Sequence, residues 1–143
     1  MSSPSYPEID ILRQLYRQGN VSLRLLGDPV DTLLKVGLTI SGREYCIYVD
    51  DEYGDYEDDR PLCCFFLTLN SLAAYKETED FLDWCNQYGL DASSEVWLPY
   101  YRDLGSIIPS IEKTLGPIDS VITPLDYQLR SGAFQALLTI EES

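Results

Sequence analysis

The residues most able to do chemistry in this chain gather in one tract, residues 50–59. The tract contains seven carboxylates and no basic residue, and its charge is half of the formal net charge of −14. Two tyrosines and one glycine interrupt the acids. In order, the tract reads Asp50, Asp51, Glu52, Tyr53, Gly54, Asp55, Tyr56, Glu57, Asp58 and Asp59.

Clustered carboxylates suit a hard cation such as Ca²⁺, which prefers six to eight oxygen ligands. Within the tract, Asp55, Glu57 and Asp59 are the candidate ligands. An EF-hand loop is excluded, because counting from Asp50 places the glycine fifth rather than sixth and a proline twelfth. A loose cation site is therefore one interpretation of the tract.

Two other interpretations of the acidic tract stay open. Carboxylates alternating with Tyr53 and Tyr56 would complement a basic protein surface, since carboxylates supply the charge and tyrosines supply rigid contact area. Alternatively, the tract is a solvated hairpin loop whose charge prevents edge pairing and aggregation. The sequence does not separate these two.

Aromatic residues form a second candidate contact surface. The chain has eleven tyrosines, and Tyr100 and Tyr101 are adjacent to each other and close to Trp97. If exposed, the three would form a hot spot for a partner. The alternative is ordinary core packing, because large aromatics are usually buried.

The sequence contains few features that are typical of an enzyme. The chain has no histidine, which removes Ser-His and Cys-His nucleophile pairs and the imidazole acid or base. Ser110 and Lys113 fit an SxxK pattern, but the companion SDN and KTG motifs are missing. No glycine-rich phosphate loop occurs. We expect a protein that is not an enzyme and that uses no cofactor.

Cysteine use and charge limit the location and the partners. Four cysteines, Cys46, Cys63, Cys64 and Cys85, form no CxxC pair, so buried reduced thiols are expected. No targeting or membrane-spanning segment is evident, which predicts a cytoplasmic protein. Strong negative charge disfavours direct nucleic-acid and membrane binding and favours a basic protein, or a cationic patch on a larger assembly.

Periodicity in the first half predicts one helix followed by strands. Residues 7–18 repeat apolar side chains at helical spacing behind a proline in the first turn. Residues 21–25, 32–41 and 44–49 alternate as strands do. Residues 61–69 form a continuous apolar run, which we assign to a central fourth strand buried on both faces. The acidic tract would then be the loop between the third and fourth strands.

The second half is predicted to be helical. Residues 78–88 begin with a threonine cap and end before a glycine. Residues 94–104 and 106–115 are predicted as two separate short helices, each containing a proline. Residues 119–140 are ambiguous between an interrupted helix and a final strand.

Together these elements predict a single domain over residues 1–143 with an α+β fold. It would have a four-stranded, mainly antiparallel sheet, with three or four helices packed on one face. For function, we expect a cytoplasmic protein-binding module, of which an inhibitor or immunity-type protein is the concrete form, and which presents the tract and the aromatic residues to a basic partner. The alternative is a calcium-binding or calcium-regulated protein that uses the same tract.

Overall fold

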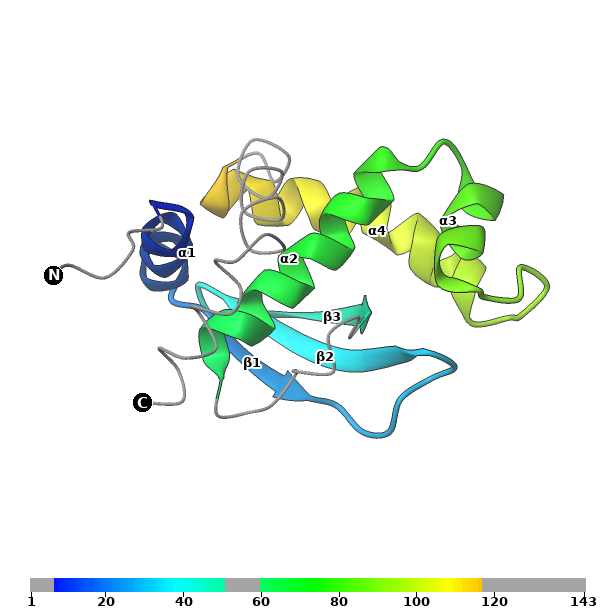
Figure 1. Cartoon of the computed structure of the whole chain (residues 1–143), viewed down its shortest axis with the longest axis horizontal. Coiled ribbons are helices and arrows are strands. Elements are labelled where there is room, and N and C mark those ends of the chain that lie inside the picture. Colours follow the sequence, from blue (N-terminus) through cyan, green and yellow to red (C-terminus); the bar gives the residue numbers. More distant parts are fainter. Residues whose placement is uncertain (1–6, 51–59, 117–143) are drawn as a thin grey trace, which may run out of the picture.

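The computed structural model describes residues 7–50 and 60–116, and these form four helices and three strands (Figure 1). In chain order the elements are α1 (Pro7–Gln18), β1 (Ser22–Leu25), β2 (Leu33–Ile40), β3 (Arg43–Asp50), α2 (Pro61–Glu77), α3 (Phe81–Tyr88) and α4 (Trp97–Leu115).

The three strands make an antiparallel sheet in the order β1-β2-β3. Leu23 lies opposite Leu38, which lies opposite Tyr45 on the far strand. Ser41 and Gly42 join β2 to β3 and have φ values of 50° and 85°. Two consecutive positive φ values match the right-handed twist of a tight hairpin, which explains the Ser-Gly pair at this position.

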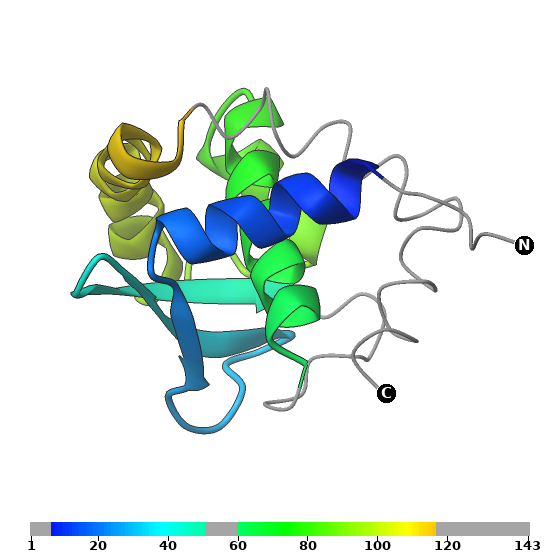
Figure 2. The same ribbon diagram turned by 90° about the vertical axis from the view of Figure 1, so that its left-hand side faces the viewer.

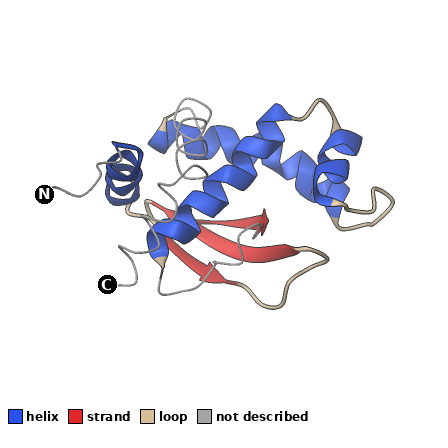
Figure 3. Ribbon diagram, viewed as in Figure 1, coloured by secondary structure: helices blue, strands red, loops and turns tan. Residues whose placement is uncertain are grey.

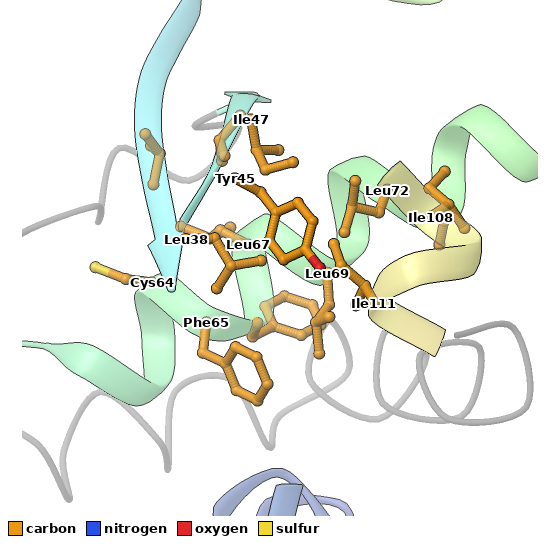
Figure 4. Packing of buried hydrophobic residues seen from close by; sticks show 14 of the residues in the cluster. Leu38, Tyr45, Ile47, Cys64, Phe65, Leu67, Leu69, Leu72, Ile108 and Ile111 are labelled. Carbon is orange, nitrogen blue, oxygen red and sulfur yellow. The ribbon is translucent and has the colours of Figure 1, made fainter. Parts of the chain in front are cut away.

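All four helices lie on one side of the sheet, with α2 running across it (Figures 1 and 3). Viewed from the side, α1 passes in front of α2 and lies above the strands (Figure 2). The main core therefore lies between one face of the sheet and the helices. Figure 4 shows it: Leu38, Tyr45 and Ile47 from the strands meet Leu67 of α2 and Ile111 of α4.

The predictions for the first half are largely confirmed. Helix α1 has the predicted bounds, and the three strands lie where alternation predicted them, within one or two residues. The described residues therefore form an α+β fold. Its sheet has three strands rather than the predicted four.

The prediction of a fourth strand at residues 61–69 is wrong, because this segment begins the 17-residue helix α2. Its apolar residues include Phe65 and Phe66, both 0% exposed, and burial extends around most of the helix. A helix buried on all sides has no apolar stripe, so its periodicity cannot be told from that of a buried strand. The length of the segment and the proline in its first turn were better indications of a helix than its periodicity.

Two predicted helix boundaries in the second half are also corrected. Thr78 ends α2, and the cap of α3 is Asp80, whose carboxylate accepts a hydrogen bond from the Asp83 amide at 2.9 Å. The helices predicted at 94–104 and 106–115 are one continuous helix, α4. Pro99 falls in its first turn, where an amide needs no helical acceptor, and Pro109 lies inside it.

Residues 119–140, whose structure the sequence leaves open, lie outside the described residues. None of the helices found in residues 7–50 and 60–116 has the length and apolar character that crossing a membrane requires.

Candidate functional site

The acidic tract begins at the end of β3 and returns at the start of α2. Asp50 is the last residue of β3, and residues 51–59 lie outside the described part of the chain. This covers most of the predicted partner-binding residues: Asp51, Glu52, Tyr53, Asp55, Tyr56, Glu57, Asp58 and Asp59, with the candidate calcium ligands Asp55, Glu57 and Asp59 among them. The tract thus connects a strand to a helix, and the prediction that it links two strands is wrong.

Both flanks of the tract are fixed in the core. The Asp50 amide donates a hydrogen bond of 3.1 Å to the Ser71 hydroxyl of α2. Val49 is 0% exposed on one flank and Cys63 is 0% exposed on the other. The carboxylates of the tract therefore start from a well-packed strand end and finish at a well-packed helix.

The second predicted contact surface lies largely inside the molecule. Trp97 is 0% exposed and Tyr100 is 8% exposed. They belong to an aromatic cluster around Trp84, whose ring centroid lies 6.1 Å from Trp97, 5.9 Å from Tyr100 and 5.8 Å from Tyr101. Trp97 and Tyr100 therefore offer a partner little contact area, which supports core packing as their role.

Polar atoms of these buried aromatics each have a partner. The Trp97 indole N–H donates to the Asp31 carboxylate at 2.8 Å. The Tyr100 hydroxyl accepts a hydrogen bond from the Tyr48 amide at 2.9 Å. Burial raises the pKa of Tyr100 far above its usual value, because the phenolate would be desolvated. Tyr100 is thus a neutral structural residue that joins α4 to β3.

Tyr101 differs from its two neighbours because it is half-buried. Burial is the main cause that raises the pKa of Tyr101. The nearby Tyr75 raises this pKa further, and the carboxylates of Asp80 and Asp83 make smaller contributions. Its ring lies 4.9 Å from that of Tyr75 and 5.4 Å from that of Phe81. Of the three aromatic candidates, Tyr101 alone keeps a partly accessible ring, and its role in binding stays a prediction.

A second acidic segment lies where α2 ends and α3 begins, and from the sequence its carboxylates were interpreted only as the acidic first turn of a predicted helix. Residues 77–83 contribute Glu77, Glu79, Asp80 and Asp83 without a basic residue, and the composition of this stretch could have revealed it. Two of these carboxylates form local hydrogen bonds: Asp80 caps α3, and Asp83 accepts a hydrogen bond from the Glu79 amide at 3.1 Å. The segment is therefore explained in part by helix capping.

Other candidate groups have structural surroundings. The Ser110 hydroxyl of the SxxK pattern is hydrogen-bonded to the Tyr45 hydroxyl at 2.7 Å and accepts from Arg43 at 3.2 Å. Three of the four cysteines are buried as predicted, whereas Cys46 is exposed. Within residues 7–50 and 60–116, no group of three histidine, cysteine, aspartate or glutamate side chains could hold a metal ion.

A hollow of about 660 Å³ lies against α1, and its lining within the described part of the chain comes from that helix: Asp10, Arg13, Gln14, Arg17 and Gln18. One helix surface does not make an enclosed binding site. Comparison with protein-family models, curated proteins and solved structures finds no match for this chain. Any functional conclusion therefore depends on the chain's own residues.

Proposed function

We propose that this protein is a protein-binding module, of the inhibitor or immunity type, that presents the tract of residues 50–59 to a basic surface on its partner. The observation that carries the proposal is the concentration of seven carboxylates and two tyrosines in ten consecutive residues without a base. A chain that needed acidity only for solubility could spread it over its whole surface.

The anchoring of the tract supports this role. Hydrogen bonding of the Asp50 amide to Ser71 and burial of both flanks fix where the tract leaves and rejoins the core. A charged segment held at both ends loses less conformational entropy on binding than a free tail, so more of its interaction energy remains as affinity. The concentrated negative field would also accelerate encounter with a basic partner.

The contact residues of this proposal are those of the tract, including Tyr53 and Tyr56, together with the half-buried Tyr101 of α4. Trp97 and Tyr100 are left to the core because of their burial. An interface of this kind depends on charge for its association rate and on aromatic contacts for its lifetime.

A pull-down from native lysate at low salt, eluted with a salt gradient, would recover the partner. The recovered partner is then titrated against the protein and a variant carrying Asp55→Asn, Glu57→Gln, Asp58→Asn and Asp59→Asn. We expect affinity to fall by about tenfold or more in the variant, and to weaken steeply from low to physiological salt.

A matched control removes the same number of charges elsewhere. Glu77→Gln, Glu79→Gln, Glu95→Gln and Asp103→Asn neutralise four exposed carboxylates that have no capping role. The control should retain most of the affinity. Equal losses of affinity in both variants would show that binding depends only on net charge. Unchanged affinity in the tract variant would refute the proposal.

A calcium titration followed by thermal melting separates the alternative function. A site that binds only the folded state raises the melting temperature once free calcium exceeds its dissociation constant. A shift at millimolar calcium that disappears in the tract variant would assign the tract to cation binding instead. No shift would remove the calcium alternative.

A further inference from the structure

Three half-buried aromatic rings lie together where α2, α3 and α4 meet, at the opposite end of the described part from α1 (Figure 1). Tyr75 is in the last turn of α2, Phe81 begins α3, and Tyr101 lies in the first half of α4. The ring centroid of Tyr101 lies 4.9 Å from that of Tyr75 and 5.4 Å from that of Phe81. Each of the three residues therefore contacts its neighbours and keeps part of its surface in water.

Buried neighbours hold these rings in place. Trp84, which is 2% exposed, has its ring centroid 5.8 Å from that of Tyr101 and 6.4 Å from that of Phe81. The Tyr75 hydroxyl lies beside Gly105 of α4, where an added Cβ would be 3.5 Å from the hydroxyl oxygen. Side chains that are already ordered lose little conformational entropy when a ligand binds, so more of the interaction energy remains as affinity.

Two carboxylates lie beside the rings. After burial and Tyr75, the charges of Asp80 and Asp83 also raise the pKa of Tyr101, which indicates that both lie near its hydroxyl. Asp80 accepts a hydrogen bond from the Asp83 amide, and Asp83 accepts one from the Glu79 amide. Each of these bonds uses one carboxylate oxygen, and an ionised carboxylate can accept several. No ion pair among the described residues includes either carboxylate, so both charges are available to a ligand.

Aromatic rings next to carboxylates match the chemistry of a cationic side chain. A cation is attracted to the face of an aromatic ring within about 6 Å of its centroid, and it forms charge-assisted hydrogen bonds with carboxylates. Arginine fits this combination better than lysine, because its planar guanidinium stacks on rings and offers two parallel N–H groups to a carboxylate. Among the described residues, the basic side chain found over a ring is Arg43, which lies over Tyr45 of β3 and away from this surface.

We propose that the rings of Tyr75, Phe81 and Tyr101, together with Asp80 and Asp83, form a second contact surface that binds an arginine side chain of a partner protein. This surface is distinct from the acidic tract. The tract rejoins the core at the start of α2, whereas the surface lies at the end of this helix, whose 17 residues span about 25 Å. The inference therefore stands whether or not the tract binds a partner.

An NMR titration of the full-length protein with N-acetylargininamide tests the proposal. The guanidinium is the only charge of this probe, and N-acetylcitrullinamide replaces it with a neutral urea group of similar shape. We expect saturable shifts of the ring signals of Phe81 and Tyr101 with the arginine probe. The citrulline probe should bind about fivefold more weakly or less, because it has neither the attraction to the rings nor the attraction to the carboxylates.

Two variants and a matched control decide the result. Asp80→Asn with Asp83→Asn keeps the oxygens that accept the local hydrogen bonds and removes both charges, so affinity for the arginine probe should fall about fivefold. Tyr101→Leu removes one ring face and should also weaken binding. The control, Glu95→Gln with Asp103→Asn, removes two exposed charges elsewhere and should change affinity by less than about twofold.

Unshifted signals from remote parts of the spectrum report that each variant is folded. Ring signals that do not move, equal affinity for the two probes, or an equal loss in the control variant would overturn the proposal. Shifts spread evenly over the acidic segments of the chain would overturn it as well, because they would show attraction to net charge without a defined site.

Discussion

The two outer edges of the sheet, β3 and β1, are treated differently by the helices. On β3, the Tyr48 amide donates to the Tyr100 hydroxyl of α4 and the Asp50 amide donates to the Ser71 hydroxyl of α2. The Tyr48 ring also packs edge-on against Tyr100, with centroids 4.7 Å apart. On β1, the strand is four residues long and its outward groups have no such partner among the described residues.

The difference shows two ways of handling an edge strand. Side chains from two helices satisfy the long edge at β3, which fixes α2 and α4 against the sheet. The opposite edge is limited by the shortness of β1, which has four residues. Because side chains of α2 and α4 bind the β3 edge and no such contact is found at β1 among the described residues, we expect the stability of the molecule to depend far more on the β3 side.

The largest expected effect comes from removing the aromatic centre behind β3. Trp84→Ala should destabilise the protein by about 3–5 kcal/mol, because Trp84 is 2% exposed and contacts both Trp97 and Tyr100. Leu82→Ala on the same helix is the control, since Leu82 is 61% exposed and its truncation should change stability by less than about 0.5 kcal/mol. Chemical denaturation measures both. Similar losses in the two variants would show that the cluster has no special weight.

Removing the hydroxyl that covers the β3 edge should have the next largest effect. Tyr100→Phe keeps the ring but leaves the Tyr48 amide without its acceptor, which should lower the free energy of unfolding by about 1–3 kcal/mol. Hydrogen exchange gives a local measurement: the Tyr48 amide should lose protection, whereas that of Ile47, which faces β2, should keep it. Unchanged Tyr48 protection would mean that this hydrogen bond does not seal the edge.

A smaller loss is expected at the end of β3. Ser71→Ala removes the acceptor of the Asp50 amide, and we expect a loss of about 0.5–1.5 kcal/mol because Asp50 is half-buried and water can replace the hydroxyl in part. If the tract binds a partner, the loosened anchor should also weaken binding. Chemical denaturation and a binding titration measure the two effects. A Ser71→Thr variant, which retains a hydroxyl, serves as the control.

The smallest of the four effects is expected on the open face of the sheet. Arg24 and Glu44 form an exposed ion pair at 2.8 Å, and a hydrogen bond from Arg24 holds the pKa of Glu44 below its ordinary value of 4.5. A lowered carboxyl pKa stabilises the fold above the unfolded-state value, and this stability is lost as the pH falls through the folded-state pKa. The melting temperature of Glu44→Gln should therefore fall slightly below that of the wild type at pH 7, and the difference should shrink as the pH falls through the folded-state pKa of Glu44. A difference that persisted below that pKa would point to lost packing instead.

Much of the first half could be predicted because its patterns are local. Helix α1 is amphipathic, and the strands alternate with one face buried, so their periods are visible in the sequence. Helix α2 could not be assigned by period, since its neighbours bury it on nearly every side. Pro99 and Pro109 suggested two short helices where α4 is continuous. Pro99 lies in the first turn, where a proline is compatible with a helix.

The candidate site was predictable only in part. The charge of residues 50–59 is a property of composition and needs no fold to be recognised. The exposure of Trp97, Tyr100 and Tyr101 is a property of packing, and adjacent positions on one helix have different surroundings. Only the contacts around Trp84 assign Trp97 and Tyr100 to the core and leave Tyr101 at its margin.

The sequence by itself determined the acidity, the absence of histidine chemistry, the α+β class and the first helix and three strands, since each follows from composition or short-range pattern. The tertiary structure decided that the acidic tract joins a strand to a helix, that the central apolar run is helical, and that the β3 edge is sealed by Tyr100 and Ser71. Those features depend on which distant elements meet, and contacts between residues far apart in the chain leave no periodic trace in the sequence.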